Sequence, residues 1–270
     1  MADMKIGIIG AGGRMGQACI RQVTETAGCA VVAAADLSGS PLVGIDAGEP
    51  AGAGALGVAV TDDPAEVIAA ADAIIEFTLP EPTVEHAVLT AKAGVAHIIG
   101  TTGTTAKHDD ALRVAGEETV IMHAPNMSLA VNLLIALTKQ VATTLNDDFD
   151  VEIFEMHHKH KVDAPSGTAV ALGRAAALAR GVNIDDVAQW AREGITGERR
   201  RGDIGFAALR GGNVVGDHTV TFASGDERLE ISHKAQSRQI FARGAVHAAL
   251  WSAKQTPGFY TMFDVLGIEY

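Results

Sequence analysis

The first half of the chain alternates short hydrophobic runs with segments whose hydrophobic positions recur at helical spacing. The runs are rich in β-branched residues and bounded by Gly, Asp or Thr, as in parallel strands buried on both faces. Alternating strands and helices predict a doubly wound, Rossmann-like α/β domain. The predicted strands are residues 5–10, 31–36, 73–78, 96–103 and 119–124, and the predicted helices are 15–23, 64–71, 83–93 and 106–117. Residues 38–57, rich in Gly, Ala and Pro, are predicted as a long loop.

The pattern changes after residue 126. A long hydrophobic helix is predicted over residues 128–145, then a strand in "DVEIFEMHH" and a helix that begins at Ser166. Three strands without intervening helices follow, "IGFAALR", "VVGDHTVTFA" and "ERLEISHKA", separated by turn residues at 211–213 and 224–226. This order predicts a second, α+β domain with a mixed or antiparallel sheet. A closing helix is predicted over 238–253, but its periodicity does not tell on which domain it packs.

Composition narrows the class of protein. The 270 residues carry a net charge of −12, which argues against nucleic acid or an anionic membrane as a partner. No hydrophobic run reaches the roughly 18 residues that a membrane span needs. The start, "MADMKIGIIGAGG", does not resemble a signal peptide, and Cys19 and Cys29 have neither metal nor redox spacing. We therefore expect a cytoplasmic protein with a small-molecule ligand.

A glycine-rich segment, "IIGAGGRMG", follows the first predicted strand and opens the first helix. In such a setting the backbone N–H groups of a helix N-terminus hold a dinucleotide pyrophosphate. The glycines are spaced as G-x-x-G-x-x-G, at Gly10, Gly13 and Gly16, rather than G-x-G-x-x-G. Asp36 ends the second strand, where an acid binds the ribose hydroxyls. Dinucleotide binding is the favoured interpretation, and a structural tight turn is the alternative.

The residue after Asp36 bears on the choice of cofactor. Leu37 offers no cation for a 2′-phosphate, and Asp36 would repel one, so NADH is expected to be preferred or equal, with NADPH possible through Arg14. Two further segments, "GTTG" and "APNMS", follow later strands at the edge where open α/β sheets bind ligands, although either can be a plain loop.

A basic segment, "EMHHKHKVDAPSGTA", ends a predicted strand just before a helix. Ser166 is the expected N-cap, and the N–H groups of Gly167 and Thr168 in the first turn of the helix are expected to bind an anion. Histidine and lysine beside them suit a compact polyanion such as a dicarboxylate, and histidine exchanges protons near neutral pH. A hydride acceptor with a C=C or C=N bond needs such a proton donor. The basic residues are His157, His158, Lys159, His160 and Lys161.

Three other interpretations of this segment stay open. A metal site would need more ligands than His158, His160 and nearby Asp163 supply, so no metal is expected. The segment can also be a solvated charge cluster or a patch between subunits. For the chain as a whole, the alternatives are another NAD-dependent dehydrogenase of a small anionic substrate, or an NAD-binding regulator without activity.

The same segment resembles the signature of the dihydrodipicolinate reductase (4-hydroxy-tetrahydrodipicolinate reductase) family, E-x-H-H-x-x-K-x-D-x-P-S-G-T-A. The resemblance extends over the whole chain through "GAGGRMG", "GTTG", "APNMSLAVN", "REGITGER", "IGFAALRGGNVVGDHTV", "ERLEISHKAQSR" and "FARGAVHAALW". It implies a homotetrameric enzyme of diaminopimelate and lysine biosynthesis that reduces a cyclic unsaturated dicarboxylate to tetrahydrodipicolinate with NADH or NADPH. It also implies a dinucleotide-binding domain of residues 1–127 completed by 238–270, and a substrate-binding and oligomerisation domain of 128–237.

The resemblance further implies roles for residues. His157 matches the family's proton donor and acceptor, Lys161 matches its second proton donor, and His158, Gly167 and Thr168 match its substrate contacts. The positions that match cofactor contacts are Gly10, Ala11, Gly12, Gly13, Arg14, Met15, Asp36, Gly100, Thr101, Thr102, Ala124, Pro125, Asn126 and Met127.

The chain departs from the family pattern at positions that concern the cofactor. Members of dual specificity often carry a basic residue where this chain has Leu37, and an arginine where it has Leu79. Both departures argue against a strong preference for NADPH. The basic run 199–201 has no assigned role and is expected to be a solvated loop.

Overall fold

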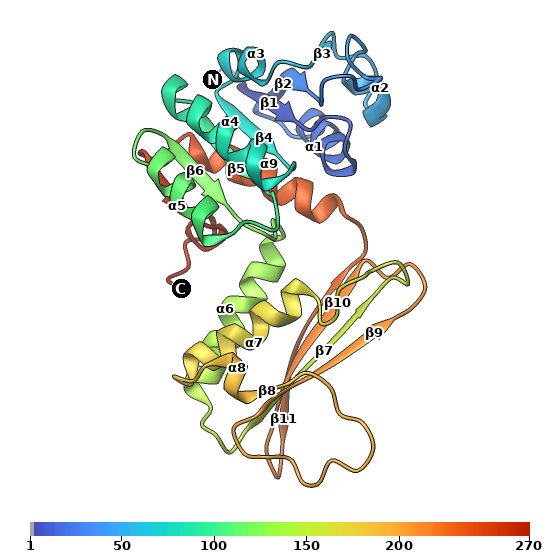
Figure 1. Cartoon of the computed structure of the whole chain (residues 1–270), viewed down its shortest axis with the longest axis vertical. Coiled ribbons are helices and arrows are strands. Elements are labelled where there is room, and N and C mark those ends of the chain that lie inside the picture. The colour runs from blue at the N-terminus through green and yellow to red at the C-terminus, as the bar shows by residue number, and fades with distance from the viewer. Residues whose placement is uncertain (1–2) are drawn as a thin grey trace. The chain divides into compact units, whose positions relative to one another are not determined.

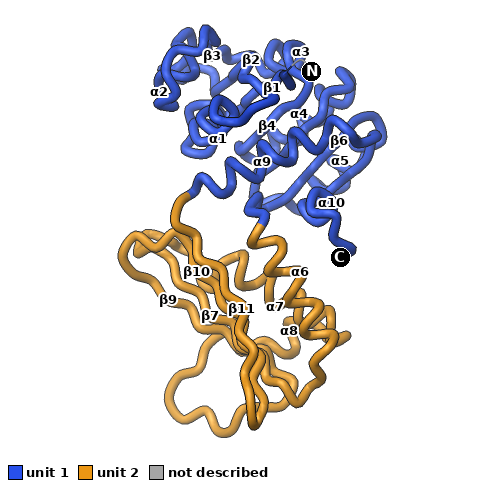
Figure 2. The backbone as a smooth tube through the Cα atoms, turned by 180° about the vertical axis from the view of Figure 1, so that it is seen from behind, with its two compact units in different colours: residues 1–129, 238–269 blue, residues 130–237, 270 orange. Residues whose placement is uncertain are grey.

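The computed structural model describes residues 3–270, which fold into two compact units (Figure 2). Unit 1 comprises the described residues up to Leu129 together with Arg238–Glu269, and unit 2 comprises Ala130–Ser237 and Tyr270. Unit 1 is thus assembled from two stretches of chain that flank unit 2 in the sequence.

Unit 1 is built on a seven-stranded sheet in which every neighbouring pair is parallel, in the order β12-β6-β5-β4-β1-β2-β3. The predicted parallel, Rossmann-like α/β fold is confirmed. Each predicted strand ends earlier than expected, so the polar residues that follow it begin loops at the carboxyl edge of the sheet. The strands are β1 (Met4–Ile9), β2 (Cys29–Ala35), β3 (Val60–Thr61), β4 (Ala73–Glu76), β5 (Ala96–Ile99), β6 (Val120–His123) and β12 (Gly258–Tyr260).

Helices cover both faces of this sheet (Figure 1). On one face α1 packs against α9, and their buried side chains join Ile8 and Ile75 of the strands in one core cluster. On the other face α3, α4 and α5 cover the alternate strand residues, among them Ile74 and Ile121. The helices are α1 (Arg14–Thr24), α3 (Pro64–Ala70), α4 (Pro80–Ala93), α5 (Ala106–Ala115) and α9 (Gln239–Ser252).

The predicted loop 38–57 is more ordered than expected. It contains a one-turn helix, α2 (Gly48–Ala51), organised by Asp46, whose carboxylate accepts backbone N–H groups from Gly48, Leu56 and Gly57. The short strands β3 and β12 and the short helix α10 (Met262–Leu266), which follows the predicted closing helix, were also not predicted. Segments of two to five residues are too short to carry a periodic signal.

Unit 2 contains a five-stranded mixed sheet in the order β11-β10-β7-β9-β8. The expectation of a mixed sheet is confirmed, but the glycine turn at 211–213 does not join neighbouring strands. Instead β7 lies between β9 and β10, parallel to the first and antiparallel to the second. Its elements are α6 (Leu129–Thr144), β7 (Asp150–His157), α7 (Gly167–Ala179), α8 (Ile184–Val187), β8 (Ala188–Gln189), β9 (Ile204–Arg210), β10 (Gly216–Ala223) and β11 (Arg228–Ala235).

The two faces of the second sheet differ. On one face Ile153, Phe206 and Val220 are buried, and α7 packs against their strands. The opposite face carries Phe154 and Leu209, which stay 40% and 46% exposed. Unit 2 therefore has a covered sheet face and an open one.

The basic run 199–201 lies in a loop in which the side chains of Arg200 and Arg201 are 66% and 71% exposed, as expected, but the expectation of solvation was wrong for Arg199. Its guanidinium pairs with Asp150 at 2.5 Å and with Glu152 at 3.0 Å, and only 20% of its side chain is exposed. Arg199 therefore fastens this loop to β7.

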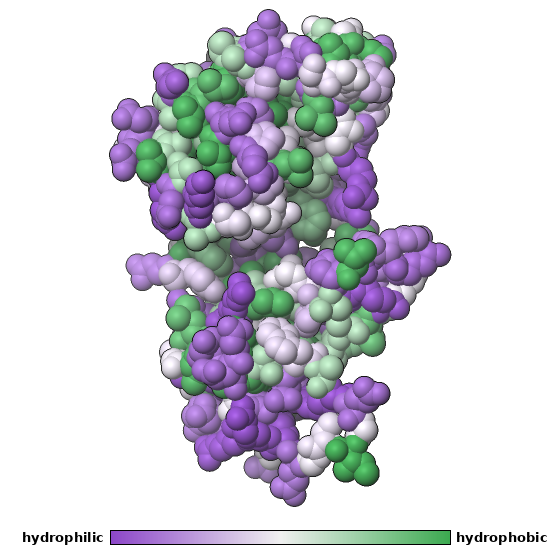
Figure 3. All heavy atoms as spheres, in the orientation of Figure 1, coloured by the Kyte–Doolittle hydropathy of each residue, from purple (hydrophilic) through white to green (hydrophobic). Residues whose placement is uncertain are grey.

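No helix among the described residues is both long and hydrophobic enough to cross a membrane. On the face drawn in Figure 3, hydrophobic residues form small groups between hydrophilic ones. Scattered groups of this kind are ordinary on a protein surface.

Candidate active site

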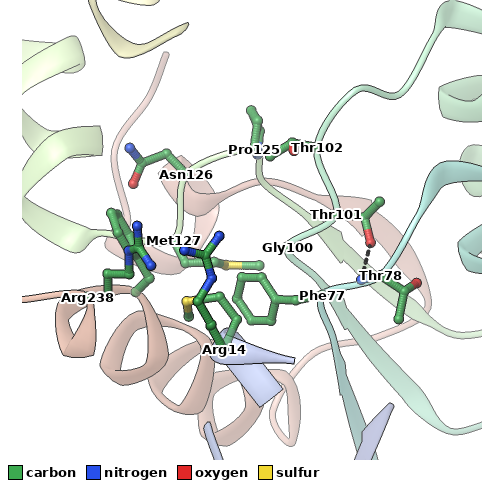
Figure 4. A pocket seen from close by; sticks show the side chains of 12 residues that line it. Arg14, Phe77, Thr78, Gly100, Thr101, Thr102, Pro125, Asn126, Met127 and Arg238 are labelled. Carbon is green, nitrogen blue, oxygen red and sulfur yellow. Dashed lines mark hydrogen bonds between the residues drawn. The ribbon is translucent and has the colours of Figure 1, made fainter. Parts of the chain in front are cut away.

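The carboxyl ends of the strands in unit 1 surround a pocket of about 400 Å³ (Figure 4). Eight of the residues predicted to contact a cofactor line it, because the loops after β4, β5 and β6 and the start of α1 all end at this edge. They are Arg14, Met15, Gly100, Thr101, Thr102, Pro125, Asn126 and Met127.

The glycine loop brings the start of α1 close to the end of β1. Gly10 has a left-handed φ of 82°, and a side chain at Gly16 would collide with the carbonyl oxygen of Gly10. Gly13 caps α1 without a side-chain bond, and no acidic residue stands in the first turn of the helix. The first N–H groups of α1 are therefore available to an anion such as a pyrophosphate.

A second pocket of about 420 Å³ adjoins the first, since Phe77 and Thr78 line both. It contains the predicted residues Gly10, Gly13 and Asp36. The Asp36 carboxylate lies against Gly12 and accepts the Ser40 hydroxyl at 2.6 Å.

The remaining predicted contacts have other places. Ala11, Gly12 and Ala124 line neither pocket, and the two alanines are buried, at 2% and 3% exposure. They can support a cofactor loop only through the backbone.

Sequence reasoning missed four residues of the first pocket: Phe77, Thr78, Arg238 and Phe241. Arg238 caps α9 and lines the same pocket as Arg14 (Figure 4). The return of the chain to unit 1 at residue 238 was implied only by the resemblance, so periodicity gave no signal for Arg238 or Phe241. Two arginines, open helix amides and a carboxylate at the end of β2 are a donor and acceptor set that fits a dinucleotide.

The polar site of unit 2 lies where β7 ends and α7 begins. His157 is the last residue of β7, and its Nδ1 lies 2.6 Å from Glu155 Oε2. The other oxygen of Glu155 accepts the Ser166 N–H at 3.0 Å. Ser166 is the N-cap of α7, as predicted, and its side chain accepts the Ala169 N–H. One buried carboxylate thus ties the histidine to the helix start.

Arg210 completes this arrangement from the neighbouring strand. Its guanidinium donates to both oxygens of Glu155, at 2.8 and 2.9 Å. Burial alone raises the pKa of the Glu155 carboxyl, but hydrogen bonds from Arg210 and His157 outweigh it and hold the pKa below its usual range. Since an ionised carboxylate only accepts hydrogen bonds, His157 carries a proton on Nδ1, and Nε2 is the ring nitrogen that this carboxylate does not hold.

His218 of β10 contacts two members of this arrangement, His157 and Ser166. Its ring packs edge-on against His157 with centroids 5.0 Å apart, and its Nε2 lies 3.0 Å from Ser166 Oγ. Burial and the neighbouring His157 lower the pKa of His218 to about 3. A neutral His218 therefore supports both His157 and the helix cap.

The other predicted residues of unit 2 lie in the loop after β7 or, for Gly167 and Thr168, in the first turn of α7. Lys161 follows β7 in a loop rather than on the strand, and its Nζ pairs with Asp163 at 2.9 Å. His158 and His160 also lie beyond the strand, with ring centroids 6.2 Å apart. Gly167 begins α7 and faces open space. Within residues 3–270, no group of three or more His, Cys, Asp or Glu side chains is placed to hold a metal ion.

Glu155 and Arg210 were absent from the predicted site, although both lay in segments quoted for the resemblance. A signal for Glu155 existed: residues two apart on a strand share a face, so Glu155 and His157 point the same way. Arg210 reaches the site because β7 and β9 pair in parallel with His157 opposite Arg210. That register joins residues 53 apart and has no local signal.

The comparisons with known proteins agree across the whole chain. Family models described as "Dihydrodipicolinate reductase, N-terminus" and "Dihydrodipicolinate reductase, C-terminus" match residues 4–127 and 130–266. A 4-hydroxy-tetrahydrodipicolinate reductase of Ruegeria pomeroyi is 55% identical over 97% of both chains. One of Rhizobium meliloti is 52% identical over 99% of this chain and 98% of its own.

A solved structure has a similar fold. The dipicolinate-bound dihydrodipicolinate reductase of Paenisporosarcina sp. TG-14 superposes with a TM-score of 0.77 at 22% identity, covering 97% of this chain and 98% of that one. Together with the two family models, these relatives establish that the chain belongs to the dihydrodipicolinate reductase family.

Proposed function

We propose that this chain reduces 4-hydroxy-tetrahydrodipicolinate to tetrahydrodipicolinate, a step of diaminopimelate and lysine biosynthesis. Relatives 52–55% identical over nearly the full length bear the name of this activity. The observation in the site that carries the proposal is the buried Arg210–Glu155–His157 chain beside the start of α7. It sets an imidazole that can exchange protons next to helix amides that can bind a carboxylate.

The residues of unit 1 would hold the nicotinamide cofactor that the family requires. The open amides of α1 and the arginines Arg14 and Arg238 would bind the pyrophosphate, and Asp36 the ribose hydroxyls. When bound, a reduced nicotinamide supplies the hydride.

The residues of unit 2 would bind the dicarboxylate and supply protons. The N–H groups of Gly167 and Thr168 and the side chain of His158 would hold the carboxylates. His157, oriented through Nδ1 by Glu155, would deliver a proton from Nε2 to the ring carbon after hydride addition. The Lys161 ammonium would act as the second proton donor and stabilise negative charge that develops in the ring.

We further propose that NADH is preferred over NADPH. The second pocket is lined by Asp36 and Asp62, whose negative charges would repel a 2′-phosphate. Leu37 in the same pocket is 76% exposed and offers no hydrogen bond in compensation. Binding of the ribose hydroxyls of NADH needs only the carboxylate of Asp36.

We also propose a cytoplasmic homotetramer. The buried cysteines Cys19 and Cys29 are both free thiols, as in a reducing compartment. The open face of the second sheet, with Phe154 and Leu209, is a surface on which subunits can associate. Light scattering of the purified protein during size-exclusion chromatography tests the subunit number, and a monomer would contradict this part of the proposal.

A coupled assay tests the reaction. Aspartate semialdehyde and pyruvate are condensed by a dihydrodipicolinate synthase, and oxidation of NADH and then of NADPH is followed by absorbance. We expect oxidation with both and a higher kcat/KM with NADH. A folded protein that binds NADH but oxidises neither cofactor would contradict the activity, and faster oxidation of NADPH would contradict the preference.

A further inference from the structure

A carboxylate is fully buried inside unit 1, outside the groups assigned so far. Glu76 is the last residue of β4 and is 0% exposed. His86 Nδ1 lies 2.9 Å from its Oε1, and His97 Nε2 lies 2.8 Å from its Oε2. Because an unpaired buried charge is very costly, these two contacts are what makes the position tolerable.

The charge on Glu76 is maintained. Burial alone would raise the pKa of this carboxyl, but the hydrogen bonds from His86 and His97 outweigh it and lower the pKa to about 2. Glu76 is therefore a carboxylate at neutral pH and can only accept hydrogen bonds. Every group that contacts its oxygens must consequently donate.

Three threonines connect this carboxylate to the cofactor pocket. The Thr78 hydroxyl donates to Glu76 Oε1, and the Thr78 N–H donates to Thr101 Oγ1 at 3.2 Å (Figure 4). The hydroxyls of Thr101 and Thr83 are 2.8 Å apart. The Thr83 hydroxyl lies 2.8 Å from the Leu79 carbonyl oxygen and 3.2 Å from Glu76 Oε1, so its proton is shared between these two acceptors. The contacts form a closed ring that begins and ends at Glu76.

Two members of the ring belong to the loops that line the first pocket. Thr78 lies in the loop after β4 and Thr101 in the loop after β5. The Thr101 carbonyl is fixed in addition by His123 Nε2 at 3.2 Å. Thr83 is 0% exposed and lines neither pocket, so it connects the two loops without facing a ligand.

We propose that Glu76 is a positioning residue for the cofactor, which holds the loops after β4 and β5 in the shape that accepts the dinucleotide. It acts through Thr78, Thr83 and Thr101 and does not touch the cofactor itself. The role rests on the proposed function only in that the ligand of this pocket is a nicotinamide dinucleotide. An amide at position 76 would present a donor where the ring requires an acceptor, and the loops would lose their common anchor.

The test is the variant Glu76→Gln, which keeps the size of the side chain. We expect the Kd and KM for NADH to rise about tenfold, the order of effect of losing a hydrogen bond to a charged group. The kcat at saturating NADH should stay nearly unchanged, since the groups of unit 2 are untouched. The Kd is measured by fluorescence titration of NADH without substrate, on protein whose folded state is checked by circular dichroism.

Two further variants keep the proposal open to contradiction. Thr83→Val removes one link of the ring and should raise the Kd in the same direction but less, and it decides the question alone if Glu76→Gln does not fold. Thr119→Val is the matched control, because Thr119 also buries a hydroxyl in unit 1, bonded to the Val95 carbonyl at 3.0 Å, away from the ring.

Wild-type affinity in the folded ring variants would overturn the proposal, as would an equal loss of affinity in Thr119→Val. Because the titration needs no substrate, absence of turnover in the wild-type enzyme would count against the proposed function alone.

Discussion

A carboxylate two positions before a histidine controls what that histidine can do. Glu155 receives hydrogen bonds from His157, Arg210 and the Ser166 N–H, which satisfy both of its oxygens. The proton on His157 Nδ1 is thereby fixed, and Nε2 is the atom left for proton transfer. Lys161, the lysine that the family resemblance pairs with this histidine, lies four residues later in a loop. There its Nζ pairs with Asp163 and not with Glu155.

Replacing Lys161 by Ala should lower kcat by roughly 10²–10⁴-fold, the usual contribution of a positioned proton donor. The Kd for NADH should stay close to that of wild type, because Lys161 belongs to unit 2. Steady-state kinetics and NADH titration measure the two effects. Lys159→Ala, an exposed lysine two positions earlier, is the control and should retain turnover. Turnover that survives in Lys161→Ala would remove this lysine from the proposed mechanism.

Replacing Glu155 by Gln should reduce kcat/KM for the substrate. An amide can turn its NH2 group to His157 Nδ1, so the imidazole is no longer held with its proton on that atom. Steady-state kinetics measure kcat/KM.

Glu152→Gln is the control for this change, since Glu152 stands on the same strand and also pairs with arginines, Arg192 and Arg199. It should lower stability without changing kcat/KM. An unchanged kcat/KM in Glu155→Gln would mean that this carboxylate does not orient His157 for the reaction.

Among the elements, the start of α7 has a double role. The Ser166 side chain caps the helix by accepting the Ala169 N–H and also meets His218 Nε2 at 3.0 Å. The cap therefore fixes the position of the Gly167 and Thr168 amides relative to the strands that carry His157 and His218.

Replacing Ser166 by Ala should cost about 1 kcal/mol of stability, as for other N-caps, and should raise the KM for the substrate. Thermal unfolding and steady-state kinetics measure the two effects. Asn183→Ala is the matched control. The Asn183 side chain caps α8 by accepting the Asp185 N–H, and the substitution removes this cap. We expect a similar loss of stability in both variants and a changed KM only in Ser166→Ala. Equal KM values would show that this cap serves the fold alone.

The elements that the sequence predicted are those with a strong local pattern. The buried strands β1, β2, β4, β5 and β6 were predictable because each is a β-branched run bounded by turn residues. Their C-terminal ends were predicted one to four residues beyond the observed ends, because residues such as Thr78 and Gly100 occur both in strands and in loops. The order of the second sheet was not predictable, since placing β7 between β9 and β10 depends on pairing between residues distant in the sequence.

The residues of the site also divide into those with a local sequence signal and those without one. The glycine loop, Asp36 and the histidine cluster lie in contiguous motifs, and their placement beside pockets or the helix start agrees with the pattern. Arg210 and Arg238 come from other parts of the chain and depend on tertiary structure. Glu76 lay in a predicted strand as a single acid among hydrophobic residues, which was a readable signal of a paired buried charge.

At the scale of the whole molecule, buried histidines make stability depend on pH. The pKa of His218 falls from 6.5 to about 3 on folding, mainly through burial. Between these two values the unfolded chain binds the proton and the folded chain does not, so stability is complete above pH 6.5 and is lost on acidification. Lowered pKa values of His123 and His233, caused first by burial, act in the same direction.

The free energy of unfolding should therefore decline below pH 6.5, with a contribution from His218 of at most about 1.4 kcal/mol per pH unit. His218→Gln should show a smaller decline of the melting temperature between pH 7.5 and 5, as followed by calorimetry. The control His247→Gln changes an exposed histidine of α9 and should keep the wild-type decline. Identical slopes in all three proteins would contradict the assignment to His218.

The division of unit 1 into two stretches of chain has a consequence for biosynthesis. Helix α9 contacts residues far earlier in the chain: Gln239 donates to Gln22, 217 positions before it, at 3.1 Å, and Gly244 lacks a side chain where it meets the Met127 carbonyl. Unit 2 is nearly continuous and can fold on the ribosome as soon as it has emerged. Unit 1 must wait for α9, so a chain that ends before residue 238 would carry His157 in a finished unit 2 and still lack Arg238 of the first pocket.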